Sequence, residues 1–300
     1  MDTTTSSHAR TEPHTTTEPR LPLWARAILA ILALQVAAWS AVPYWAVLQA
    51  LGVEASGPAA ASIGLQVLLL AGQALITLSL YMGLSALLVR RVDRRPVRAL
   101  GLAVTPRAIG GLGLGMGISL VVALAGYGIV TALGIGREMP LPVDEDMPTW
   151  LLIAYVLILA FVLQGIGEEV LFRGYLLQSG SRRPHRAVLV SAIAFTLPHL
   201  LSQGGQQSLL EHLVYLVIPF GFSLSAAYLA IAMRSVWAAV GIHAGFHVAT
   251  AVCLALGMLI EGLALWVVLG TLHAIAGVVI ARFIPRERWA EVAAAGPYGR

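Results

Sequence analysis

The sequence lacks lysine and asparagine altogether, and it has few charged residues of any kind. Charged side chains make up 11% of the 300 residues and hydrophobic ones 58%, with a mean hydropathy of +0.82, whereas soluble domains carry about 25% charged residues. The single cysteine, Cys253, excludes an intrachain disulfide and gives no indication of the redox compartment. This composition excludes an ordinary soluble domain and predicts an all-α polytopic membrane protein.

All 19 basic residues are arginine, and the formal net charge is +4. Arginine without lysine or asparagine is typical of a GC-rich genome, so we expect a bacterial source. Most arginines flank apolar runs, a pattern that favours an anionic membrane surface and does not indicate a nucleic-acid partner. Residues 1–21 are rich in Thr and Pro and lack a long apolar stretch. They are expected to form a disordered cytoplasmic tail, with no cleavable signal peptide.

Eight apolar runs predict about eight transmembrane helices across a core of about 30 Å. The runs cover residues 22–51, 60–89, 109–134, 149–178, 187–201, 212–233, 236–257 and 262–282. Arginines cluster in alternate loops, and the opposite loops are acidic or neutral. By the positive-inside rule, both termini lie in the cytoplasm, and we expect an integral protein of the bacterial plasma membrane. Residues 22–284 form one membrane domain in this interpretation, and residues 285–300 form a second cytoplasmic tail.

The glycine-rich stretch "GGLGLGMG", residues 110–117, falls within the third predicted span. A phosphate-binding loop would need a preceding strand and a following helix, which a spanning segment does not provide. Small residues allow two transmembrane helices to approach closely. The stretch therefore predicts close helix packing and not nucleotide binding.

Few ionisable side chains remain at membrane depth once the ends and loops are set aside. They are Glu168, Glu169 and Arg173 in span four, His199 in span five, His243 and His247 in span seven, and His273 in span eight. Ionisable residues inside a membrane are costly and usually functional. A rise of about 1.5 Å per residue places the groups of spans four, five and seven at similar depths, which predicts an active site among these three spans.

The motif "EEVLFR" in span four carries two glutamates with different predicted environments. Glu169 and Arg173 are four residues apart and share a helix face, so they are expected to form an ion pair. Glu168 points about 100° away, and it is free to face a cavity and act as a general base. The alternative is that all three side chains form a purely structural contact between helices.

The remaining candidate residues are histidines on spans five, seven and eight. In "HAGFH", His243 and His247 share one helical face, a spacing that lets two imidazoles approach one metal ion or one substrate oxygen. In "FTLPHL", Phe195 lies one turn before His199, and Pro198 is expected to bend the helix. A lone intramembrane histidine can simply bond to a neighbouring helix, and this interpretation suits His273 best.

The three motifs, in this order, resemble those of the CAAX protease and bacteriocin-processing (CPBP) family of intramembrane proteases, whose patterns are EExxxR, FxxxH and HxxxN. The resemblance covers a motif core at residues 149–255 within a transmembrane protease domain at residues 22–284. It implies a CAAX-prenyl-protease-like endopeptidase, acting on a membrane-anchored peptide or protein, in which Glu168 activates water and His199 and His243 position it or hold a metal. His247 departs from the family, which commonly has asparagine there.

Two mechanisms stay open at this point. His199, His243 and His247 would supply three nitrogen ligands to Zn²⁺ in a metalloprotease, and the presence of His247 favours this version. In a metal-free version, Glu168 deprotonates water and the histidines donate hydrogen bonds to the oxyanion. The sequence contains no HExxH, GxGD or GxSG protease motif. The alternative functions are a proton-coupled transporter and a non-catalytic immunity or scaffold protein that keeps the protease fold.

Overall fold

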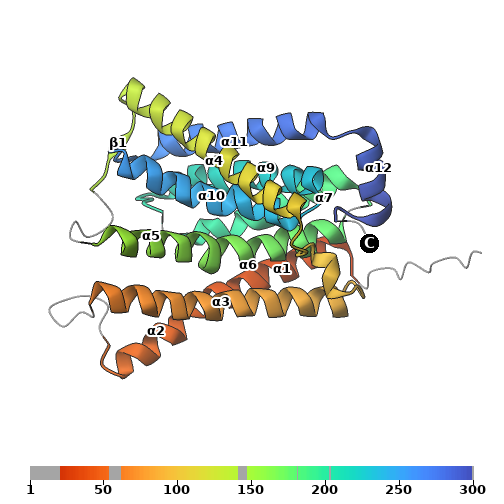
Figure 1. The fold of residues 1–300 in the computed structure, drawn as a ribbon, viewed down its shortest axis with the longest axis horizontal. Helices are drawn as coiled ribbons and strands as arrows, with labels where there is room; N and C mark the ends of the chain where they lie inside the picture. The colour runs from red at the N-terminus through yellow and green to blue at the C-terminus, as the bar shows by residue number, and fades with distance from the viewer. Residues whose placement is uncertain (1–20, 54–61, 141–146, 181, 203, 299–300) are drawn as a thin grey trace, which may run out of the picture.

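The computed structural model describes residues 21–53, 62–140, 147–180, 182–202 and 204–298. It confirms the all-α polytopic fold: seven helical segments of the described residues are long and apolar enough to cross a membrane. These segments are Leu23–Ala50, Ile63–Arg91, Pro106–Leu133, Thr149–Leu177, Leu209–Met233, Val236–Ala255 and Leu263–Phe283. They lie roughly parallel in Figure 1. Residues 1–20 of the predicted N-terminal tail lie outside the described residues.

The predicted fifth span, residues 187–201, is not a continuous spanning helix. It consists of α7 (Pro184–Thr196) followed by the 3₁₀ helix η4 (Leu197–Leu201), which contains Pro198. Helix α7 is about 20 Å long, shorter than the hydrocarbon core of about 30 Å. The eight predicted spans therefore correspond, within the described chain, to seven long helical segments and one short composite segment.

Several of the long segments are interrupted. The first contains α1 (Leu23–Ala38) and α2 (Ala41–Ala50), and the segment after α7 contains α8 (Leu209–Tyr215) and α9 (Val217–Met233). The other long helices are α3 (Ile63–Arg91), α4 (Pro106–Leu133), α10 (Val236–Ala255) and α11 (Leu263–Phe283). The short 3₁₀ helix η1 (Val97–Leu100) connects α3 to α4.

Hydroxyl side chains fix where α4 and α10 begin. The Thr105 hydroxyl accepts a hydrogen bond from the backbone N–H of Ala108 at 3.1 Å, and Pro106 occupies the first helical position of α4. The Ser235 hydroxyl accepts from the N–H of Trp237 at 3.2 Å. Such caps satisfy amides that have no partner within the helix. They set the registers of two helices that pack directly on each other.

Glycines bring α4 and α10 into backbone contact. A Cβ atom added to Gly115 would lie 2.6 Å from the carbonyl oxygen of Ala238, and one added to Gly245 would lie 2.7 Å from Cα of Met116. The Ser119 hydroxyl adds a hydrogen bond of 2.7 Å to the carbonyl of Ile242. The predicted role of residues 110–117 in close helix packing is confirmed. Through this contact α4 fixes the position of α10, which carries His243 and His247.

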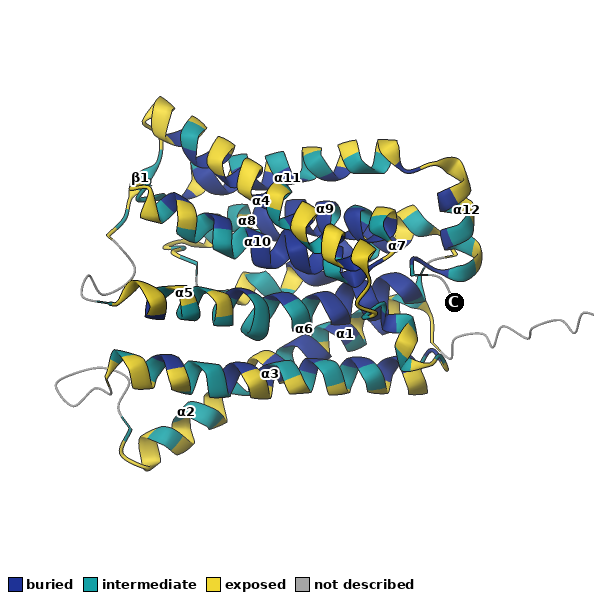
Figure 2. Cartoon of the chain, in the orientation of Figure 1, coloured by how far each residue is buried: buried dark blue, intermediate teal, exposed yellow. Residues whose placement is uncertain are grey.

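Buried residues are concentrated on the central helices α9 and α10, and exposed residues on the outer faces of α3, α4 and α11 (Figure 2). The exposed faces carry large apolar side chains such as Leu68 and Val121, each 67% exposed. A lipid environment accommodates such faces, whereas a water-soluble protein rarely exposes apolar patches of this size. The burial pattern therefore agrees with an integral membrane protein.

The two ends of the bundle differ. At one end, β1 (Arg137–Glu138) pairs antiparallel with β2 (Ile260–Glu261). At the other end, α12 (Arg286–Ala295) crosses the bundle, so part of the predicted tail at residues 285–300 is a packed helix. Figure 1 places β1 and α12 at opposite ends of the molecule.

Candidate active site

The fourth span is π-helical on both sides of its glutamates. It begins as α5 (Thr149–Leu157) and continues through the π-helix η2 (Ile158–Gly165), the short α6 (Ile166–Glu169) and a second π-helix, η3 (Val170–Leu177). π-Helical turns are rare and often occur at functional sites. Here they change the direction of the side chains immediately before and after Glu168 and Glu169.

Arg173 is fully buried and lies at the centre of a polar cluster. Its Nη1 lies 2.9 Å from Oε1 of Glu169, which confirms the predicted ion pair. Its Nη2 donates to the hydroxyl of Ser223 at 2.5 Å and to the Ser223 carbonyl at 3.2 Å. The guanidinium carbon also lies 4.7 Å from the centre of the Phe195 ring, a cation–π distance. Three elements besides its own, α6, α7 and α9, thus hold this one side chain.

His243 joins the same cluster from α10. Its Nδ1 lies 3.0 Å from Oε1 of Glu169, so one carboxylate oxygen contacts both the arginine and the histidine. Because a carboxylate oxygen can only accept, Nδ1 of His243 donates and its Nε2 is left for another partner. Glu169 is therefore tied to its surroundings on two sides.

Glu168 faces in another direction, as the helix geometry predicts. It lines a cavity of about 280 Å³ together with His199, Tyr81, Gln164 and Gln35. The Tyr81 hydroxyl lies close enough to the Glu168 carboxylate to interact with it electrostatically. No hydrogen-bond partner within the described residues reaches Oε2 of Glu168. Since a water molecule occupies about 30 Å³, the cavity has room for several waters beside the Glu168 side chain.

Gly167 makes the contact between α6 and Tyr81 possible. A Cβ atom at this position would lie 2.8 Å from Cγ of the Tyr81 ring, so any larger residue would displace the ring. Tyr81 itself is 1% exposed. The glycine that precedes the two glutamates thus determines how closely α3 approaches the cavity.

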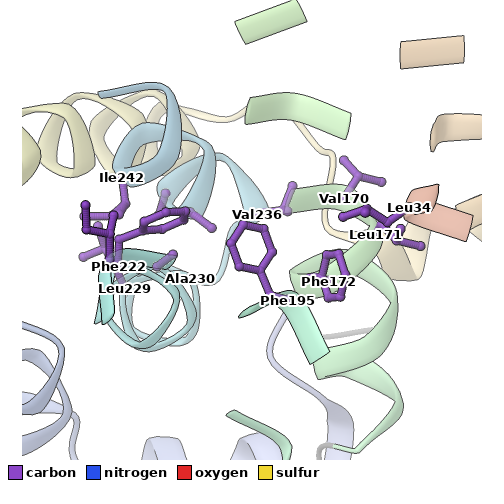
Figure 3. Close-up of a cluster of buried hydrophobic side chains, with 14 of the residues drawn as sticks. Leu34, Val170, Leu171, Phe172, Phe195, Phe222, Leu229, Ala230, Val236 and Ile242 are labelled. Carbon is purple, nitrogen blue, oxygen red and sulfur yellow. The ribbon is translucent and has the colours of Figure 1, made fainter. Parts of the chain in front are cut away.

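His199 lies on the opposite wall of this cavity, on η4. Its Nδ1 lies 2.9 Å from the carbonyl oxygen of Phe195, and the two ring centres are 4.7 Å apart. A carbonyl oxygen can only accept, so Nδ1 donates, and in the neutral ring Nε2 is an acceptor. Figure 3 shows Phe195 among buried side chains between Phe172 and the α9–α10 cluster that includes Phe222. Packing around Phe195 therefore fixes the orientation of His199.

His247 lies one turn beyond His243, and their ring centres are 5.4 Å apart. It lines a second, larger cavity of about 840 Å³. Most of the side chains around this cavity are apolar, among them Leu152, Val156 and Leu159. The predicted site residues therefore lie between two cavities: Glu168 and His199 line the smaller one, and His247 lines the larger.

The histidines do not converge on one point as a zinc site requires. Across the described residues, no group of three or more His, Cys, Asp or Glu side chains is arranged to hold a metal ion. His199 and His243 each donate through Nδ1, as metal-ligating histidines do, but a third donor does not meet them. The predicted zinc site of His199, His243 and His247 stays a prediction. His273 instead bonds to the Ser225 hydroxyl at 3.3 Å.

Some polar neighbours of the site were not predicted from the sequence. Tyr81 and Gln164 line the smaller cavity, and Ser223 contacts Arg173. All three lie within predicted spans, but the sequence argument considered mainly charged residues and histidines. A search for every polar side chain at membrane depth would have included them.

The comparisons with known proteins agree with the motif analysis. Residues 149–249, about a third of the chain, match the family model described as type II CAAX prenyl endopeptidase Rce1-like. A search of curated proteins found no match to the chain. The matched region contains all six predicted site residues and implies a lipid bilayer environment with a membrane-associated substrate. The match confirms the predicted family resemblance and, at the level of that Rce1-like family, supports a CAAX-type intramembrane protease.

Proposed function

We propose that the chain is an intramembrane endopeptidase in which Glu168 activates the water that attacks the peptide bond. The observation that carries the proposal is the different surroundings of the two adjacent glutamates. Glu169 is held through its Oε1 by Arg173 and His243, whereas Glu168 lines a cavity shared with His199; each carboxylate also has a buried Oε2 without a hydrogen-bond partner among the described residues. A structural contact with Arg173 needs only one of these carboxylates.

The geometry supports a division of roles among the site residues. A water in the smaller cavity gives a proton to Glu168, while Nε2 of His199 accepts a hydrogen bond and orients the water. The hydroxide attacks the carbonyl carbon, and Glu168 passes the proton to the leaving amine. His247 has no hydrogen bond within the described residues that fixes its tautomer, so it is the histidine that can donate to the oxyanion. Arg173 and Glu169 hold His243 beside these groups.

The larger cavity suggests where the substrate binds. Its apolar wall is suited to the apolar side chains of a membrane-anchored peptide, and His247 in that wall places the carbonyl group near the smaller cavity. A substrate of this kind approaches from the cavity of about 840 Å³, while water approaches from the cavity of about 280 Å³.

Glu168→Gln is the test of the general base. The substitution keeps the shape of the side chain but removes its basicity, so we expect cleavage to fall by at least about 10²-fold with little change in melting temperature. The assay is cleavage of membrane-anchored peptides by the purified protein in detergent, with a panel that varies the apolar residues. Glu138→Gln is a matched control, because Glu138 is exposed and belongs to neither cavity. If Glu168→Gln cleaves as fast as the wild type, Glu169 becomes the candidate base.

The proposed orientation places the α12 end of the bundle in the cytoplasm of a bacterium and the β1–β2 end outside. Support comes from the arginines between the spans, which gather toward the α12 end. On a Cys253→Ser background, Met147→Cys should react with an impermeant thiol reagent added to intact cells, and Arg183→Cys should not. The opposite labelling pattern would overturn the orientation.

A further inference from the structure

The segment at residues 286–298 is attached to the bundle by several kinds of contact. The Trp289 ring lies 4.3 Å from the ring of His185 on α7, centre to centre. Nε of Arg288 donates to the carbonyl of Ile231 on α9 at 3.0 Å. Glu291 forms ion pairs with Arg234 and with Arg288. Helix α12 is therefore held against both α7 and α9.

Beyond α12 the chain turns back toward the fourth span. Gly296 makes this turn with φ of +93°, a conformation that disfavours other residues. A Cβ atom there would also collide with the side chain of Gln178. The side chain of Arg288 donates to the carbonyl of Pro297 and so holds the segment that turns back. The turn brings Tyr298 to the base of the polar cluster.

Tyr298 makes a direct contact with the backbone of Arg173. Its hydroxyl donates to the Arg173 carbonyl oxygen at 2.8 Å. Each carbonyl has two lone pairs, so this oxygen can accept from Tyr298 in addition to the bond of the π-helix η3. The ring packs over Gly101, where a Cβ atom would lie only 2.6 Å away and where φ is +76°. Gly101 is thus shaped to receive this aromatic ring.

The same contact also reaches the helix that carries the histidines. The carbonyl of Gly101 accepts a hydrogen bond of 3.4 Å from the N–H of Val236, the first residue of α10. Tyr298 therefore contacts η3 directly, through the carbonyl of Arg173, and is linked to the start of α10 indirectly, through Gly101. Arg173, whose carbonyl accepts from Tyr298, also forms the ion pair with Glu169, and Glu169 in turn contacts His243.

We propose that Tyr298 is a positioning residue of the active site, which holds the backbone at Arg173 and thereby the geometry of Glu169 and His243. The proposal rests on the proposed function, because positioning has a catalytic consequence only if the site cleaves peptides. Residues 286–298 act as a strap in this interpretation, with α12 as its anchor and the Tyr298 hydroxyl as its contact with the fourth span.

The first test is Tyr298→Phe, which removes the hydroxyl and keeps the ring over Gly101. Loss of one such hydrogen bond is expected to lower kcat by about fivefold, with KM unchanged and no marked shift in melting temperature. Tyr228→Phe is the matched control, because Tyr228 contacts Trp289 of the same anchor but does not touch Arg173. If Tyr298→Phe keeps the wild-type kcat, or if both variants lose activity only in step with melting temperature, the proposal is overturned.

The second test asks whether Tyr298 acts through Arg173. Ser223→Ala removes another hydrogen bond of this arginine, so the two substitutions should be coupled. We expect the double variant Tyr298→Phe/Ser223→Ala to lose less activity than the product of the two single losses. Losses that multiply independently would show that Tyr298 does not act through Arg173.

Hydrogen exchange gives a readout that does not depend on activity. In Tyr298→Phe, amides in peptides covering residues 169–178 should exchange about fivefold faster, while Tyr228→Phe should leave them unchanged. If the wild type cleaves no peptide in the panel, the proposed function fails, but faster exchange in Tyr298→Phe still supports the strap. Unchanged exchange in that variant overturns it.

Discussion

Arg173 and Arg137 have similar partners at very different depths. Arg173 pairs with Glu169 at 2.9 Å. Arg137 pairs with Glu211 at 2.9 Å and with Glu261 at 3.1 Å. Each arginine also donates to a backbone carbonyl. The Arg173 side chain is 0% exposed, however, and the Arg137 side chain is 33% exposed.

This difference in burial determines what each cluster contributes. Breaking a buried ion pair leaves a charge that neither water nor a partner compensates, whereas water replaces the lost partner at an exposed site. The buried cluster contains His243 and belongs to the candidate active site. The partly exposed cluster of Arg137, Glu211 and Glu261 joins separate segments at the rim of the larger cavity, which Glu261 also lines. Similar ion pairs thus position the site residues around Arg173 and hold separate surface segments together around Arg137.

Among the substitutions that compare the two arginine clusters, Arg173→Ala is expected to have the largest effect on stability and activity. It leaves Glu169 buried beside His243 without its arginine, which costs about 3–5 kcal/mol in the free energy of unfolding and should also abolish cleavage. Thermal melting in detergent measures the stability. Ser223→Ala serves as a graded control, since it removes only one hydrogen bond of the charged Arg173 side chain, worth about 1.5–3 kcal/mol. An unchanged melting temperature in Arg173→Ala would contradict the structural role of the ion pair.

Substitutions at His247 test whether the active site cleaves peptides without a bound metal ion. The described donors do not converge on a metal, so we expect cleavage to persist in the presence of a chelator. His247→Asn should keep activity, because an amide N–H can donate to the oxyanion as an imidazole does. His247→Ala should lose about 10²-fold, the cost of removing one oxyanion donor.

Elemental analysis of the same proteins separates the two mechanisms. If His247 is a zinc ligand, His247→Asn should lose both metal and activity, because an amide binds zinc poorly. Stoichiometric zinc in the wild type, absent from His247→Asn and needed for cleavage, would establish the metal version and contradict the roles proposed for the histidines.

The contacts within one helix were predictable from the sequence, and those between distant segments were only partly so. The spacing of Glu169 and Arg173 predicts their ion pair, because residues four apart meet on one helix face. For His243 and Glu169, the sequence predicted only that they lie at a similar depth in the membrane, not that they are in contact. The depth of a residue in the membrane follows from the rise per residue. Which faces of two helices meet depends instead on packing, and here the glycines of α4 and α10 determine that packing.

Other features gave no local signal in the sequence. The π-helices η2 and η3 depend on how the fourth span packs, whereas the end of α7 at the following 3₁₀ turn was indicated by Pro198. Residues 285–300 have the polar composition of a tail, and their docking depends on contacts such as Tyr298 with Arg173, which lie 125 residues apart. Arg137 and its glutamates are likewise distant in the chain, so only the topology predicted that they share one end of the bundle.

Arg137→Ala is expected to have the smallest effect. Its partners Glu211 and Glu261 are accessible to water, so the melting temperature should fall much less than in Arg173→Ala, and the fall should shrink further in high salt because exposed charges are screened. Glu138→Ala is the control in the neighbouring position of β1, whose side chain is exposed. Melting curves at low and high salt measure both effects. If Arg137→Ala lowered the melting temperature as much as Arg173→Ala does, independently of salt, burial would not decide the cost of breaking these ion pairs. The β1–β2 end would then be as essential to the fold as the polar cluster.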